Sequence, residues 1–125
     1  MQITKKKFIL TILIFTLAIT GVFSQGKKDA LKLYRNGDYA EAIKVCLQEI
    51  EEKPNNMDSY VVLCWSLVKN KQYSEAELWA KKGREISSYD QRIIEILGEA
   101  KYYLGKNSEA LSLFQEYISL VPANG

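Results

Sequence analysis

The sequence contains no histidine, and only two cysteines and two prolines, among its 125 residues. Without histidine, the chain lacks the commonest general base of hydrolases and the imidazole ligand of most catalytic zinc sites. Two cysteines are too few for a four-cysteine zinc site or for a disulfide framework. We therefore expect no metal, no cofactor and no catalytic site, and an enzyme is the weakest of the functions considered.

The chain also lacks a strong charge of either sign. Its formal net charge is +2, and 47% of its residues are hydrophobic, as in ordinary globular proteins. Lys5, Lys6 and Lys7 are the only charged residues among the first 26, so the remainder carries 14 basic and 15 acidic side chains, a net charge of −1. A chain without a large basic face is not expected to bind nucleic acid.

Residues 1–24 have the pattern of a signal peptide. The basic run Lys5–Lys7 precedes an apolar stretch, and small residues ending at Ser24 predict cleavage before Gln25. An uncleaved membrane anchor is the alternative, although the 16 residues of Phe8–Phe23 fall just short of the roughly 17–25 that a spanning helix needs. Either way we expect the rest of the chain outside the cytoplasm, periplasmic or secreted, or membrane-anchored and facing the periplasm.

After residue 24 the sequence repeats with a period of 34, which divides it into units 25–56, 57–90 and 91–124. Glu-Ala pairs recur in register at 41–42, 75–76 and 109–110. Within each unit, apolar residues at helical spacing occur twice, on either side of a short polar turn. The pattern predicts two helices per unit, the second of each pair being Tyr39–Glu52, Tyr73–Ser87 and Asn107–Leu120.

Particular residues at fixed places in the units carry a family resemblance. In the third unit these are Leu97, Gly98, Tyr102, Gly105, Glu109, Ala110, Phe114 and Pro122; in the second, Tyr60, Leu63, Cys64, Leu67, Tyr73, Glu75, Ala76 and Ala80; in the first, Ala30, Gly37, Asp38, Tyr39, Glu41, Ala42, Pro54, Asn55 and Asn56. On these residues the chain resembles the tetratricopeptide repeat (TPR) family. The resemblance implies an all-α fold, a TPR α-solenoid of three helix-turn-helix repeats, and a role in protein–protein interaction.

Stacked repeats of this kind form a concave surface lined by the first helix of each unit. The resemblance implies that this groove binds an extended peptide or a partner helix. Mapped by the 34-residue spacing, the groove positions are Lys27, Leu31, Tyr34, Arg35, Val61, Trp65, Val68, Lys69, Arg92, Glu95, Glu99, Tyr102 and Tyr103. The middle of this set is apolar and its edges are charged, which favours an apolar partner segment. The alternative for Trp65 is a place in the core.

One variant of the family grips a C-terminal carboxylate with two lysines, two asparagines and an arginine. Here only Lys27 and Arg92 match that set, while Leu31, Val62 and Ile96 stand where the other polar groups would be. We therefore do not expect recognition of a carboxylate tail of that type.

Two further features concern contacts beyond the groove. Cys46 and Cys64 fall on adjacent predicted helices, and either a disulfide or two buried small residues fits, of which we favour the buried residues. The last predicted helix has no following helix to cover it within this sequence. An exposed C-terminal face is therefore expected, consisting of Phe114, Tyr117, Ile118 and Val121. Self-association, another subunit or a longer repeat array could cover it.

We predict an exported TPR module that binds an extended or helical apolar segment of a partner protein. A single-pass, membrane-anchored TPR scaffold subunit of an envelope complex is the first alternative. A small extracytoplasmic enzyme is the second.

Overall fold

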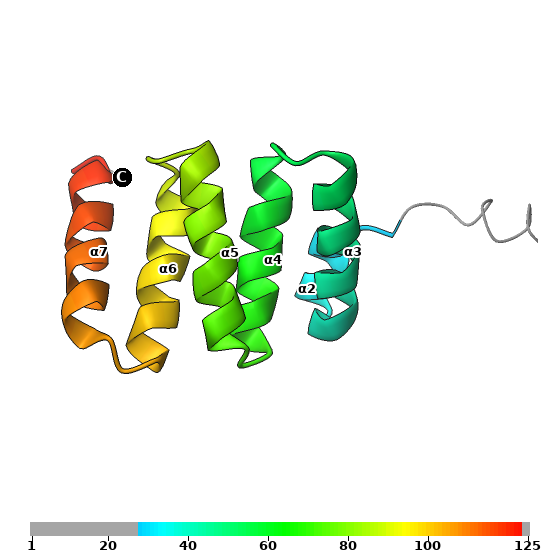
Figure 1. The fold of residues 1–125 in the computed structure, drawn as a ribbon, viewed down its shortest axis with the longest axis horizontal. Coiled ribbons are helices and arrows are strands. Elements are labelled where there is room, and N and C mark those ends of the chain that lie inside the picture. Colours follow the sequence, from blue (N-terminus) through cyan, green and yellow to red (C-terminus); the bar gives the residue numbers. More distant parts are fainter. Residues whose placement is uncertain (1–27, 124–125) are drawn as a thin grey trace, which may run out of the picture.

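The structure is a computed structural model that describes residues 28–123, and this part of the chain is entirely helical. The helices pair antiparallel as α2 with α3, α4 with α5 and α6 with α7, and the pairs stand side by side in one row (Figure 1). The bounds are α2 Ala30–Arg35, α3 Tyr39–Glu52, α4 Met57–Lys69, α5 Tyr73–Ile86, α6 Gln91–Tyr103 and α7 Asn107–Leu120. The predicted all-α class is confirmed, and α3 and α7 have the bounds that the sequence pattern predicts.

The turn inside each helix pair needs one residue in the left-handed region. Gly37 (φ 84°) and Gly105 (φ 78°) adopt it in the outer units, where glycine pays no steric penalty. In the middle unit Lys71 (φ 60°) occupies the equivalent place. The amide of Gln72 still donates to the carbonyl of Leu67 at 2.8 Å, so the turn keeps its hydrogen bond despite the unfavourable residue.

Small residues set the distance between neighbouring helices. Ala42, Ala76 and Ala110 are buried. A Cβ placed on Gly98 would lie 2.8 Å from Cε1 of Phe114, so α6 and α7 can approach as they do only with glycine at this position. At Gly83 the corresponding contact, with Cδ1 of Ile93, is 3.1 Å. Small residues at these positions therefore let neighbouring helices pack closely.

The core is concentrated on α4, the helix in the middle of the row. Nine of its 13 residues are buried, because α3 and α5 pack on either side and α2 and α6 also contact it. Cys46 and Cys64 are both buried and unbonded. Burial raises the pKa of the Cys46 thiol to about 12 and also raises that of Cys64, so neither is a reactive thiolate at neutral pH.

Within residues 28–123, no helix combines the length and the apolar character that crossing a membrane requires. The predicted signal segment and Lys27 lie outside the described residues.

Candidate partner-binding groove

The first helices of the three units, α2, α4 and α6, neighbour one another along one face of the molecule. A pocket of about 400 Å³ opens on this face. Its lining comes chiefly from α2, from the first half of α4 and from the start of α6: Asp29, Ala30, Leu31, Arg35, Glu49, Asn56, Asp58, Ser59, Val61, Val62, Trp65 and Arg92. Of the predicted groove residues, the pocket brings together Leu31, Arg35, Val61, Trp65 and Arg92.

Trp65 serves both the pocket and the core. Its ring stacks on Tyr34 with centroids 5.7 Å apart and planes at 28°, and the side chain is half-buried against the hydrophobic core. Tyr34 in turn contacts the ring of Tyr39. Trp65 therefore contributes both to the groove and to the core, the two alternatives that the sequence left open.

The apolar middle of the surface is smaller than the sequence suggested. Val61 and Val68 were expected to be exposed there, but both are buried. The reason is that α4 has a neighbouring first helix on each side, so its outward positions lie beneath the side chains of α2 and α6. Val61 still forms part of the pocket wall, whereas Val68 does not.

Arg92 is held by two carboxylates. Its Nε and Nη2 atoms donate to Asp90 at 3.0 and 2.7 Å, and its Nη1 atom donates to Asp58 at 2.9 Å. The guanidinium holds the pKa of Asp90 below its usual value, and the two acids raise the pKa of Arg92. Each nitrogen of this guanidinium makes one of these bonds, so Arg92 links α6 to α4, and the two acids already neutralise its charge.

The other charges of the predicted groove are not paired in this way. Arg35 lines the pocket and has no ion-pair partner among residues 28–123. Lys69, Glu95 and Glu99 lie outside the pocket, and the described part of the chain offers them no ion-pair partner either. The pocket's own acids are occupied: Asp29 caps α2, and Glu49 accepts from the hydroxyl of Ser59 at 2.7 Å.

Tyr102 and Tyr103 form a separate aromatic cluster with Tyr73. The rings of Tyr73 and Tyr103 stack with centroids 4.5 Å apart, and Tyr102 meets the edge of Tyr103. Both α6 tyrosines are exposed. The cluster lies outside the pocket.

Sequence reasoning missed the pocket residues Asn56 and Ser59, and it did not pair Asp58 with Arg92. A signal for Asp58 exists in the sequence, because Asp58 and its partner Arg92 are 34 residues apart, one full repeat. Equivalent positions in successive units lie side by side in a solenoid, so opposite charges at that spacing predict an ion pair.

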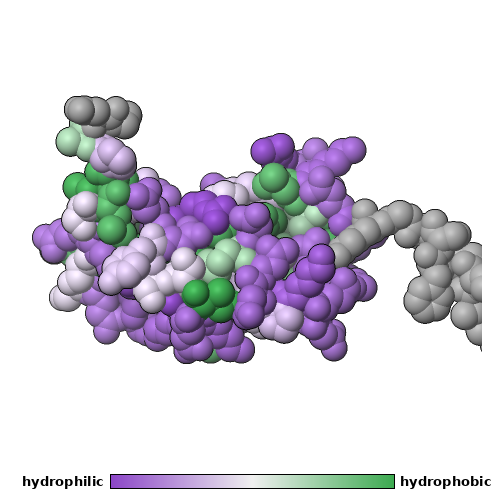
Figure 2. Space-filling view, turned by 90° about the horizontal axis from the view of Figure 1, so that it is seen from above, coloured by the Kyte–Doolittle hydropathy of each residue, from purple (hydrophilic) through white to green (hydrophobic). Residues whose placement is uncertain are grey.

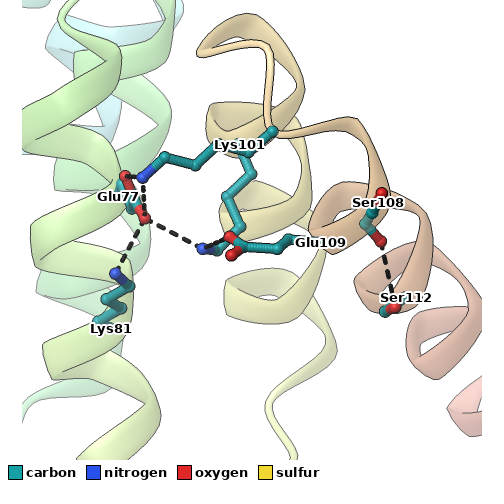
Figure 3. Close-up of polar contacts among 7 residues, drawn as sticks. Glu77, Lys81, Lys101, Ser108, Glu109 and Ser112 are labelled. Atoms are coloured by element: carbon teal, nitrogen blue, oxygen red, sulfur yellow. Dashed lines mark hydrogen bonds and ion pairs between the residues drawn. The ribbon is translucent and has the colours of Figure 1, made fainter.

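A cluster of charged side chains away from the groove was also unforeseen. Glu77 on α5 is 7% exposed and accepts hydrogen bonds from Lys101 at 3.0 Å and from Lys106 at 2.9 Å (Figure 3). It also pairs with Lys81, at 2.9 Å. Hydrogen bonds from these lysines, that of Lys106 foremost, lower the pKa of Glu77 to about 2. Lys101 also pairs with Glu109, so the cluster joins α5, α6 and α7.

The predicted C-terminal face is exposed only in part. Ile118 and Val121 are exposed, whereas Phe114 and Tyr117 are half-buried and therefore do not stand free as expected. Phe114 packs its ring on Gly98, and Tyr117 packs against the core cluster.

Comparison with known proteins identifies the fold through solved structures and not through sequence. No protein-family model matches the chain, and no curated protein matches its sequence. Solved structures do match. The second TPR of Spaghetti (RPAP3), bound to the HSP90 peptide SRMEEVD, is 22% identical with a TM-score of 0.73 over 76% of this chain and 88% of that one. The first TPR domain of human RPAP3 is 21% identical, with a TM-score of 0.73 over 78% and 76%. The TPR domain of Arabidopsis OM64 is 18% identical, with a TM-score of 0.74 over 78% and 80%.

The described chain has the TPR fold. The predicted fold class, a TPR α-solenoid, is thereby confirmed. At identities this low the likeness concerns the fold alone.

Proposed function

We propose that the chain is a protein–protein interaction module that binds a partner segment at the pocket between α2, α4 and α6. The observation that carries the proposal is the pocket of about 400 Å³ that places Trp65 and Leu31 beside Arg35, which has no ion-pair partner among residues 28–123. Tryptophan and arginine are enriched among the residues that dominate binding energy. Peptide-bound structures of the same fold, such as the second TPR of Spaghetti (RPAP3), support the same reading.

We infer that the bound segment is apolar, extended or helical, and that it is not gripped by a terminal carboxylate. Each nitrogen of the Arg92 guanidinium already donates to Asp58 or Asp90, and these two carboxylates outnumber its single positive charge. Val62 and Ile96, which stand where carboxylate-binding polar groups would be, are buried and apolar. An apolar side chain placed against Trp65 and Leu31 would meet no unpaired acid.

We propose that the module works outside the cytoplasm, with residues 1–24 directing export. The support is the basic, apolar and small-residue pattern of that segment. Intact-mass measurement of the protein from the envelope fraction should give a chain that starts at Gln25. A full-length mass with tight membrane association would favour the alternative, a membrane-anchored scaffold subunit of an envelope complex.

The two tryptophans allow the pocket to be tested by fluorescence. Trp65 lines the pocket, whereas Trp79 lies elsewhere, against Tyr60 and under the amine of Lys82. A peptide selected by phage display on the native chain serves as the probe. In Trp79→Phe, which keeps Trp65, the emission should shift and saturate as the peptide is added. In the matched variant Trp65→Phe, which keeps Trp79, no shift should follow.

Affinity gives a second measurement of the same site. Trp65→Ala should weaken binding of the selected peptide by about 1–4 kcal/mol. Because Trp65 is half-buried, the variant should also unfold at a lower temperature, so binding is measured where circular dichroism shows intact helices. Unchanged affinity, or an emission shift from Trp79 alone, would place the binding site elsewhere.

A further inference from the structure

Each unit's second helix, α3 and α5, is covered on its outer face by the first helix of the next unit. Among the described residues, no helix covers the same face of α7. Spacing by 34 residues relates Ile50 on α3 to Arg84 on α5 and Ile118 on α7. Ile50 is 7% exposed because α4 packs over it, whereas Ile118 is 69% exposed. The repeat pattern therefore builds on α7 the same surface that receives a helix elsewhere.

This surface is an apolar stripe along the whole helix. Leu111, two helical turns before Ile118, is 58% exposed, although Glu77, at the equivalent position on α5, is buried. Phe114, half-buried, lies between Leu111 and Ile118, and Val121 follows at the end of the helix. In Figure 2, hydrophobic residues gather at the end of the row near the last described residues. The ten residue-to-residue steps from Leu111 to Val121 make the stripe about 15 Å long.

The stripe is electrically neutral, and this neutrality favours a partner surface that is also neutral. The two charged residues of α7 are Glu109, paired with Lys101, and Glu116, which accepts two hydrogen bonds from Arg84 at 2.6 and 3.2 Å. The remaining polar neighbours are serines and Gln115. The hydroxyls of Ser112 and Ser119 already donate to carbonyls of their own helix, as Figure 3 shows for Ser112, so their burial leaves no donor unsatisfied.

We propose that α7 pairs with α7 of a second copy of this chain. A two-fold contact sets the same patch against itself, and a neutral patch does so without like-charge repulsion. A different partner usually gains specificity from complementary charges, and the stripe offers none. In antiparallel pairing, Leu111 of one copy lies opposite Ile118 of the other, and Gln115 lies near the two-fold axis.

The size of the stripe sets the expected strength. One helix is about 10 Å wide, so the contact is smaller than the ~800 Å² per partner of a standard interface. We therefore expect a reversible dimer with a dissociation constant on the order of 100 μM.

Sedimentation velocity over a range of concentrations tests the proposal on the 125-residue chain. Ile118→Glu should abolish the dimer, because it places a charge in the neutral stripe. The matched control Leu78→Glu changes a leucine on α5 that is also exposed and should leave the dimer intact. All variants carry residues 1–27, so any association through that segment is common to them. Both substituted side chains are exposed, so circular dichroism should show unchanged helix content.

Disulfide trapping tests the geometry independently. Gln115→Cys should form a covalent dimer under mild oxidation, and Ser74→Cys, at an exposed position on α5, should not. The native thiols are buried and unreactive, so they do not compete. A monomer at every concentration, or the same degree of association in the native chain and in Ile118→Glu, would overturn the proposal, and neither result bears on the groove.

Discussion

At the scale of single residues, Glu77 shows how a polar side chain replaces an apolar contact between units. Its equivalents, Ile43 and Leu111, are hydrophobic. Glu77 is nevertheless buried, because Lys101 of α6 and Lys106 of the following turn satisfy its oxygens. A buried carboxylate without such partners would cost several kcal/mol. These two lysines, together with Lys81 on α5, therefore decide whether this position stabilises or weakens the contact between the units.

This cluster predicts a pH-dependent stability. The pKa of Glu77 is about 2 in the folded chain, against an ordinary value of 4.5. A lowered folded-state pKa means that the contribution is complete above about pH 4.5 and is lost as the pH falls through about 2. Glu77→Gln should lower the free energy of unfolding by about 1–3 kcal/mol at neutral pH. The difference from the native chain should shrink steadily towards pH 2, as measured by urea unfolding.

Glu75→Gln is the matched control, since Glu75 lies on the same helix, is exposed and, within residues 28–123, accepts a hydrogen bond only from the side-chain amide of Gln72. It should change stability little. If both variants behaved alike at every pH, the lysine contacts of Glu77 would contribute nothing specific.

At the scale of helices and turns, much of the fold could be predicted because the determining signals are local. Apolar residues at helical spacing define the helices, and Gly37 and Gly105 mark two of the three turns. The third turn contains Lys71 in the left-handed region, which costs roughly 1–2 kcal/mol for a residue with a side chain. The 34-residue register still predicts a turn there, since Lys71 occupies the glycine column.

The candidate site was less predictable, because spacing along a helix gives the direction of a side chain but not its depth. Val61 and Val68 point to the predicted face and are buried there by neighbouring helices. Leu31 and Trp65 point to the same face and remain half-buried. The outcome depends on how closely α2 and α6 approach α4, which the spacing of residues along one helix does not give.

At the scale of the whole molecule, burial is distributed unevenly along the row. Nine of 13 residues are buried in α4 and seven of 13 in α6, but only two of 14 in α7. The short α2 has six residues, of which Ala30 alone is buried. Because each unit contacts only its neighbours, the stability of a solenoid falls towards its unpartnered ends.

Hydrogen exchange should report this gradient directly. Amides of α4 and α6 should exchange slowest, since opening them requires separation from helices on several sides, and amides of α2 and α7 should exchange fastest. Mass spectrometry of peptides from exchanged protein measures the four helices separately. At low concentration, protection of α7 equal to that of α4 would contradict the gradient. At high concentration, slower exchange confined to α7 is expected if its neutral stripe is covered by a second copy, and Ile118→Glu should remove that slowing while α4 keeps its protection.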